Sequence, residues 1–197
     1  NSDLLGSGIA LYGTAKGLAA ILGTGSNVGW YEGQEITRRS VSLGYLFGDE
    51  GSGAHLGKSF LSRYLRGEWA QPVRQAFEQY MGMTDMAMLS KLYGSPFPNR
   101  ILAGIAVFLE SQWQHEEIRA MVRDCFDAFF RIQVLPLLEG VDSRRVGFTG
   151  SIAAAFAEPL HFIADQHSIM ISGILKSPVQ ALAGFHGDEV GTSQRTS

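Results

Sequence analysis

The segment RRVGFTGSIAAAFAEPLHFIADQHSIMIS, residues 144–172, most constrains the fold of this 197-residue chain. A strand pattern, RRVGFT, leads through a Gly-Ser turn to a helical pattern, IAAAFAEPLHFIAD, and then to a second strand, SIMIS. Two strands joined by a helix in this way are usually parallel, and the crossover between them is right-handed. The chain is therefore expected to be an α/β protein built around a sheet with parallel strands.

Before this unit, the first third of the chain predicts one helix and then three strands, over residues 3–12, 18–23, 27–32 and 34–39. The strands follow each other closely enough to form an antiparallel meander, with a tight turn at Glu32-Gly33. A glycine-rich loop through Gly53 then leads to a helix over about 54–66, whose apolar residues share one face.

The middle of the chain is expected to form a helical insert, from about residue 72 to residue 139. Gly and Pro residues divide it into helices expected over 72–81, 84–93, 98–109 and 116–138. Pro136 should bend or end the last of these, because proline lacks the N–H that an inner helical turn needs. A final helix is expected to have Ser177 as its N-cap and Pro178 as its first residue and to end near Phe185, before a loose polar tail over 187–197.

Composition argues against several classes of function. The formal charge of −3 and the pI near 5.9 speak against a nucleic-acid surface, since binding to phosphate backbones needs clustered Lys and Arg. No apolar run approaches the length of a membrane span, so no membrane partner is expected. The single Cys125 cannot form an internal disulfide, which favours a reducing, cytoplasmic compartment. The His residues lack the spacing of a zinc site, and no metal ligand is predicted.

Three clusters of glycine and hydroxyl residues are candidates for binding a polar ligand: GTGSN at 23–27, GDEGSG at 48–53 and TGS at 149–151. Each has a structural alternative. The first can be a hairpin turn, the second a flexible loop before a helix, and the third an ordinary N-cap at Ser151. The third also lies between a strand and a helix, where free N–H groups favour an anion. It is less expected that all three clusters are merely structural than that any single one of them is.

Two common nucleotide motifs are similar to parts of the sequence but do not fit. GTGSNVG has the third glycine of the dinucleotide fingerprint one residue late, and a strand pattern follows it in place of a helix. GSGAHLGKS is similar to a P-loop, but the first glycine of that motif should stand at Ser52. Its Gly57-Lys58-Ser59 also falls inside a helical pattern, so the P-loop interpretation is disfavoured.

Four segments, in order along the chain, carry a resemblance: ILGTGSN, SLGYLFGDEGSGAHLG, VGFTGSIA and KSPVQALAGFH. Together they resemble the N-acetylglucosamine kinase and BadF/BadG/BcrA/BcrD ATPase family, within the sugar kinase, actin and heat-shock ATPase superfamily. The resemblance implies an α/β, ribonuclease-H-like, actin-superfamily ATPase domain. It covers residues 1–186 and implies that they form the C-terminal nucleotide- and sugar-binding domain of a two-domain kinase.

The hairpin cluster resembles the second phosphate motif of that family. The resemblance implies that the backbone amides of Gly23, Thr24 and Gly25 face the phosphates of ATP, and that Ser26 and Asn27 lie toward the sugar. Glycine suits such a place because without a Cβ its backbone can approach a phosphate closely.

The resemblance also assigns the other two clusters and one carboxylate near the start. Gly150 and Ser151 would lie near the nucleotide, Asp49 would hydrogen-bond sugar hydroxyls, and Asp3 matches the catalytic aspartate. A sugar hydroxyl needs only a carboxylate within hydrogen-bond reach to take its proton during phosphoryl transfer. Asp3 could equally be the N-cap of the first helix, and both roles can hold together.

The sequence also departs from the family pattern. A first phosphate motif, similar to Asp-Gly-Gly-Gly-Thr-Lys, is absent, together with most of the sugar-binding half and the aspartate that helps to hold Mg²⁺. The chain starts inside an apparent helix and without Met, so it is expected to be a piece of a longer protein and inactive alone. Leu43 stands where some amino-sugar kinases carry Trp, and Cys125 alone cannot supply the iron–sulfur ligands of the family's activators.

The function implied by the resemblance is transfer of the γ-phosphate of ATP to a hydroxyl of an amino sugar such as N-acetylglucosamine. ATP and Mg²⁺ would be required, and the partner would be a small sugar, with no nucleic acid or membrane involved; a homodimer is compatible with the family. Two alternatives stay open. The protein could be an ATPase that activates a partner enzyme, or a non-catalytic sensor that binds a nucleotide or sugar.

Overall fold

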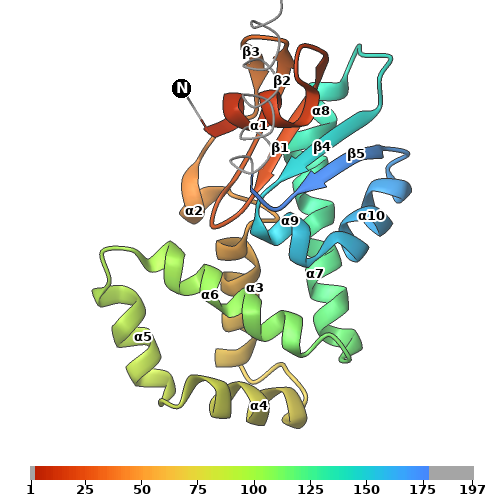
Figure 1. Cartoon of the computed structure of the whole chain (residues 1–197). Helices are drawn as coiled ribbons and strands as arrows, with labels where there is room; N and C mark the ends of the chain where they lie inside the picture. The colour runs from red at the N-terminus through yellow and green to blue at the C-terminus, as the bar shows by residue number, and fades with distance from the viewer. Residues whose placement is uncertain (1–2, 178–197) are drawn as a thin grey trace, which may run out of the picture.

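The computed structural model describes residues 3–177, so the helix and tail expected beyond them lie outside the described residues. Within that range, five strands form one sheet in the order β3-β2-β1-β4-β5 (Figure 1). They are β1 (Lys16–Leu22), β2 (Ser26–Glu32), β3 (Ile36–Arg39), β4 (Arg145–Thr149) and β5 (Met170–Leu175). β1, β2 and β3 form the antiparallel meander, and β4 pairs in parallel with both β1 and β5. The mixed α/β fold expected from the sequence is confirmed.

Most helices in the described range follow the expected pattern, with ends that differ by a few residues; the exceptions are a short helix over 44–47, which the sequence does not predict, and the region after β4. The helices are α1 (Asp3–Tyr12), α2 (Gly44–Phe47), α3 (Gly53–Leu65), α4 (Gln71–Met81), α5 (Asp85–Gly94), α6 (Pro98–Ser111), α7 (Glu116–Phe129), α8 (Leu135–Leu138), α9 (Ser151–Ala155) and α10 (Ala157–Gln166). All elements between α3 and β4 are helical. None of the helices within residues 3–177 combines the length and apolarity that crossing a bilayer would require.

The two faces of the sheet are covered by different helices because strand side chains alternate between faces. On β4, a Cβ at Gly147 would lie 2.9 Å from the hydroxyl oxygen of Tyr12, so this face meets α1 at close range. The next residue, Phe148, points to the other face, where its ring centroid lies 6.0 Å from that of Phe129 and 6.1 Å from that of Phe130. The main hydrophobic core lies on this second face.

Near Pro136 the helix changes type. The helical segment does not end there: a π-helical turn (Phe130–Val134) connects α7 to α8, and Pro136 lies just inside α8. A proline ring presses on the preceding turn and supplies no N–H, and a wider turn before it relieves both problems.

The single helix expected after β4 is wrong in detail, since it breaks into α9 and α10 at Phe156. This residue has φ −112° and ψ 37° and is 2% exposed. Its ring packs edge-on against Trp113 and Phe126, with centroids 5.6 and 6.4 Å away. Burial of one aromatic ring against distant helices therefore outweighs local helix continuity.

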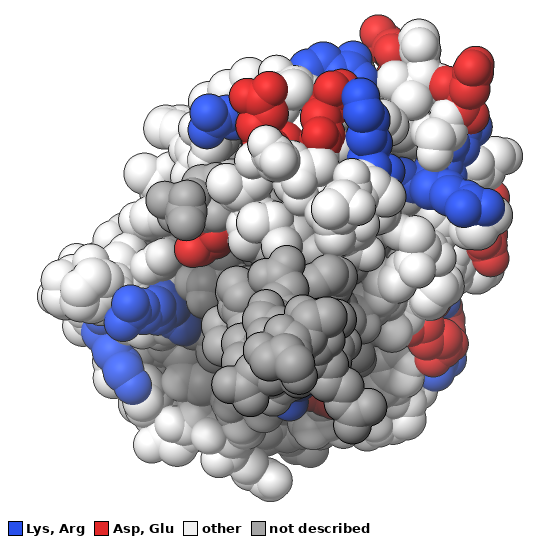
Figure 2. All heavy atoms as spheres, turned by 45° about the horizontal axis from the view of Figure 1, so that its top comes forward, with Lys and Arg blue, Asp and Glu red and all other residues white. Residues whose placement is uncertain are grey.

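The helices α3 to α6 form a separate layer at one end of the sheet, in the lower part of Figure 1. Its centre is an aromatic cluster in which Phe77 lies 4.8 Å from Phe60 and 5.0 Å from Phe108, measured between ring centroids. The helices α3 and α6 touch closely, because a Cβ on Gly57 would lie 2.0 Å from the carbonyl oxygen of Leu102. In a view tilted by 45° so that the top of Figure 1 comes forward, Lys and Arg side chains lie among Asp and Glu side chains over the upper part of the surface (Figure 2).

Candidate functional site

The β1–β2 hairpin and the loop before α3 are joined at one edge of the sheet. The Gly23 carbonyl accepts from the Gly53 N–H at 2.8 Å, and the Thr24 carbonyl accepts from the Ala54 N–H at 3.1 Å. These bonds satisfy first-turn amides of α3 that would otherwise lack partners. The sequence-predicted clusters GTGSN and GDEGSG are therefore brought together, and the tip of the hairpin is anchored more firmly than a free turn.

The third cluster meets the same edge, because β1 and β4 are parallel neighbours and their carboxyl ends lie side by side. Gly150 has φ 117°, a conformation that residues with a side chain rarely adopt. A Cβ there would lie 2.1 Å from the carbonyl oxygen of Leu22, the last residue of β1. Ser151 is exposed and is the first residue of α9, whose N-cap is Gly150, so the N-cap alternative for Ser151 is wrong.

Asp3 lies at the carboxyl-end edge as well. It is the exposed first residue of α1, so the helix starts at Asp3 and not after it. Its carbonyl oxygen accepts from the Ser7 hydroxyl at 3.0 Å, and the Ser7 Oγ lies 2.8 Å from the Oγ1 of Thr149 at the end of β4. Ser7 and Thr149 are buried, at 0% and 1% exposure, so this link ties the first turn of α1 to the TGS cluster.

The polar groups on the other side of the hairpin cluster around Asp49. Its φ of 56° places it in the left-handed region, which is uncommon for a residue other than glycine and is often associated with functional sites. Its Oδ1 accepts from the Ser26 N–H at 3.4 Å. Next along β2, the Asn27 Oδ1 is buried without a hydrogen-bond partner among the described residues. An acceptor left unpaired in this way is costly unless a ligand or water reaches it.

Burial raises the pKa of Asp49, partly offset by the hydrogen bond from Ser26. The folded protein therefore holds this proton more tightly than the unfolded chain, and the associated stability is lost as pH rises through the raised pKa. We expect Asp49→Asn, which keeps an acceptor for Ser26 and tolerates left-handed backbone, to exceed the wild type in unfolding free energy at pH 7 but not at about pH 4.

Urea unfolding at both pH values measures this difference, and Asp165→Asn on the exposed face of α10 is the matched control. An Asp49→Asn variant whose stability relative to the wild type is the same at both pH values would contradict the expectation.

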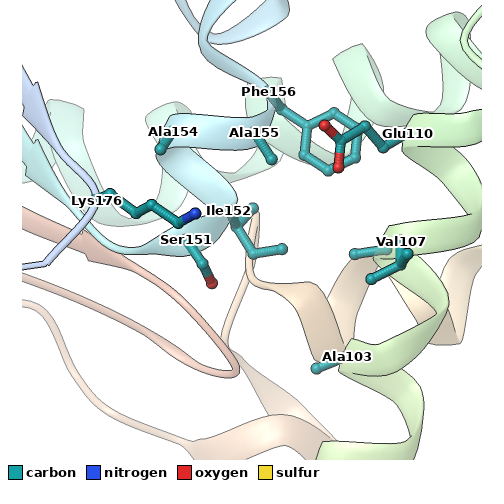
Figure 3. A pocket seen from close by; sticks show the side chains of 10 residues that line it. Ala103, Val107, Glu110, Ser151, Ile152, Ala154, Ala155, Phe156 and Lys176 are labelled. Atoms are coloured by element: carbon teal, nitrogen blue, oxygen red, sulfur yellow. The ribbon is translucent and has the colours of Figure 1, made fainter.

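A cleft leads away from the hairpin between α6 and α9 (Figure 3). Its volume is about 450 Å³, and the residues around it are Ala103, Ala106, Val107, Glu110, Ser151, Ile152, Ala154, Ala155, Phe156 and Lys176. A smaller pocket of about 230 Å³ adjoins it and is lined by Gly23, Thr24, Arg100, Ala103, Gly104, Ser151 and Ile152. The two pockets share Ala103, Ser151 and Ile152, so they form one groove that ends at the hairpin. The groove places the first and third clusters on a common surface.

Several groups in this groove were missed by reasoning from the sequence. Arg100 and Glu110 come from α6, and Lys176 follows β5 with its side chain extending toward Ser151 (Figure 3). Nothing in the sequence near these residues indicates a site. Arg100 stacks on Phe97 at 4.8 Å, and no acidic side chain within residues 3–177 pairs with it.

A site for Mg²⁺ built from protein side chains would need several oxygen donors close together. Within residues 3–177 no group of three or more His, Cys, Asp or Glu side chains could bind a metal ion. The described residues therefore do not bring such a set of ligands together.

No protein-family model and no curated protein matches the chain. Among solved structures, the chain is similar to a Porphyromonas gingivalis protein named "Putative N-acetylglucosamine Kinase", with 34% identity and a TM-score of 0.89 over 95% of this chain and 66% of that one. A Chromobacterium violaceum protein of the same name has 24% identity and a TM-score of 0.71 over 92% and 64% of the two chains, and supports the fold alone. The chain thus spans slightly less than two thirds of these neighbours. The similarity shows that this chain shares its fold with both proteins.

Proposed function

We propose that this chain forms the nucleotide- and sugar-binding core of an ATP-dependent kinase that phosphorylates a hydroxyl of an amino sugar. The observation that carries the proposal is the position of the GTGSN hairpin. One side of it borders the groove between α6 and α9, and the other side meets the polar cluster around Asp49. The mixed sheet supports the ribonuclease-H-like assignment, and the similarity to the longer Porphyromonas gingivalis chain supports a place within a larger kinase.

The groove has the properties of a nucleotide site. Its larger part is of a size typical for small-molecule pockets and is mostly apolar, which suits a nucleoside. The phosphates would then lie at the hairpin end, where no hydrogen bond in the described residues engages the backbone N–H of Thr24 or Gly25. Free amides and the nearby Arg100 are the donors that phosphate oxygens require. For Thr24, Gly25, Gly150 and Ser151 the proposal takes the roles that the resemblance implies. The Gly23 N–H instead donates to the Gly25 carbonyl at 3.0 Å, so the expectation that this amide faces the phosphates is not kept.

The acceptor sugar would lie on the far side of the hairpin. Asp49 offers a carboxylate, and the Oδ1 of Asn27 is a buried acceptor without a partner among the described residues. Sugar hydroxyls are both donors and acceptors, so they can satisfy these groups. A Cβ on Gly25 would lie 3.0 Å from the Oδ2 of Asp49, so glycine keeps the phosphate loop and the acceptor loop in close contact.

In phosphoryl transfer the protein mainly positions the reactants and stabilises charge. ATP supplies the transferred group when bound, and this chain orients the phosphates through the hairpin amides. Asp3, at the same edge of the sheet, would accept the proton of the sugar hydroxyl as the transfer proceeds. Closure of the groove on binding would exclude water.

A coupled ADP-release assay on the full-length product of the gene, with a panel of hexoses and hexosamines, tests this proposal. ADP release that requires an amino sugar and yields a phosphosugar is the expected result. ATP hydrolysis that ignores sugar but rises with a partner protein would favour an ATPase activator. Binding of ATP or sugar without turnover would favour a sensor.

Arg100→Met should weaken binding of ATP to this chain about tenfold or more, because a charge-assisted hydrogen bond to phosphate is lost. Binding of adenosine, which lacks phosphates, should change little. Isothermal titration with both ligands measures the two effects. Arg66→Met, at the exposed end of α3 and remote from the groove, is the matched control. Equal losses for ATP and adenosine would contradict a phosphate contact at Arg100.

A further inference from the structure

Gln133 is a buried polar residue in the π-helical turn between α7 and α8. It is 4% exposed, and its neighbours in the turn, Phe130 and Val134, are fully buried. A polar amide in such surroundings is expected to have specific hydrogen-bond partners, since an unpaired one is costly. π-helical turns are also rare and frequently lie at functional sites. The hydrogen-bond partners of the Gln133 amide are therefore the key to its role.

The Gln133 amide connects three segments that are distant in sequence. Its Nε2 donates to the Ser26 Oγ at 2.9 Å and to the Glu50 Oε2 at 2.7 Å. Its Oε1 accepts from the Ser40 Oγ at 3.3 Å. Both N–H groups of the amide are thereby used, and a carboxylate as partner fixes which end of the amide carries the nitrogen. Few side chains could replace this set of one acceptor and two donors.

The partners of Gln133 flank the proposed acceptor site. Ser26 starts β2 beside Asn27, and its N–H donates to Asp49 at 3.4 Å. Glu50 follows Asp49 directly in the chain and is half-buried. One amide thus holds both the hairpin end and the carboxylate loop against the π-helical turn. A sugar bound at the proposed acceptor site would lie between these two segments, so the distance between them decides whether both can contact it.

We propose that Gln133 is a positioning residue that sets the distance between the Ser26–Asn27 end of the hairpin and the Asp49–Glu50 loop. The inference rests on the proposed function, because it assigns these two segments to the acceptor sugar. Gln133 itself does not touch the reacting atoms. Its role is to keep Glu50 paired and to keep the two segments in register, so it should affect the sugar and not the nucleotide.

The first test is Gln133→Met in the full-length protein, which keeps the length of the side chain but removes every hydrogen bond. Gln79→Met, on the exposed face of α4, is the matched control. We expect the KM for the amino sugar to rise about tenfold or more, while the KM for ATP stays within about twofold. An unchanged sugar KM in a folded Gln133→Met protein would overturn the proposal, and so would equal increases in both KM values.

A second variant, Gln133→Glu, keeps the proposal testable if the methionine variant does not fold. At high pH its carboxylate would face Glu50 at hydrogen-bond distance and repel it, whereas at low pH one shared proton would restore a donor to Glu50. We expect the sugar KM of this variant to approach the wild-type value near pH 5.5 and to exceed it about tenfold near pH 8. A ratio to the wild type that does not change with pH would overturn the proposal.

The outcome for the wild type separates this inference from the proposed function. Absence of sugar-dependent turnover in the wild type would refute the proposed function. The positioning role would then be decided by amide hydrogen exchange measured at pH 8 in Gln133→Glu and in the wild type. Faster exchange of residues 24–28 and 48–53 in the variant than in the wild type would support the role. Unchanged protection of both segments overturns it. Wild-type turnover with an unaltered Gln133→Glu refutes the positioning role alone.

Discussion

Replacing Asp3 by Asn in the full-length protein is expected to lower kcat by about 10²- to 10⁴-fold, the usual contribution of a general base. The amide has the size of the carboxylate but cannot accept the proton of a sugar hydroxyl. Asp3 is exposed at the start of α1, and the link from Ser7 to Thr149 holds that turn at the carboxyl edge of β4. Because the change leaves this backbone link intact, ATP binding should be retained.

The measurement is sugar-dependent ADP release, with kcat and both KM values determined separately. Asp165→Asn, an exposed substitution on α10, should behave as the wild type. Near-normal kcat in Asp3→Asn would refute the general-base role and leave Asp3 as part of the start of α1.

Gly150→Ala is expected to cause the largest loss of stability, about 2–4 kcal/mol in the free energy of unfolding. The added Cβ would lie 2.1 Å from the Leu22 carbonyl oxygen, a contact that real Cβ atoms do not make. The φ of 117° is also strained for any residue with a side chain. Relief requires β1 and β4 to move apart just where the groove begins, so binding of ATP should be lost as well.

Urea unfolding and ATP titration of this chain test both effects. Gly94→Ala, at the end of α5, is a suitable control because a Cβ there meets no atom within 4 Å. Its effect on the unfolding free energy should stay within about 1 kcal/mol. A Gly150→Ala protein as stable as the wild type, with unchanged ATP binding, would contradict the expectation that the close approach of Gly150 to Leu22 contributes to stability and binding.

Only part of the candidate site could be predicted from the sequence. The clusters at 23–27, 48–53 and 149–151 were identified by their glycine and hydroxyl content, and the pairing of β1 with β4 brings them to one edge. Their assignment to phosphate, sugar and adenosine came from the family resemblance and remains a prediction. Arg100 and Gln133 carried no such local signal. Arg100 lines a pocket with Gly23 and Thr24, and Gln133 donates to Ser26, 107 residues away, so in both cases the relevant neighbour is distant in the sequence.

The sequence by itself determined the elements of this protein: the antiparallel meander, the β-α-β unit and the helices between them. Side-chain periodicity and turn chemistry act over a few residues, so these features can be read locally. The tertiary structure alone decided the break at Phe156, the π-helical turn before Pro136 and the groove between α6 and α9. Periodicity tells which face of a helix is buried, but the neighbour that it meets depends on packing across the whole chain, and that packing builds the site.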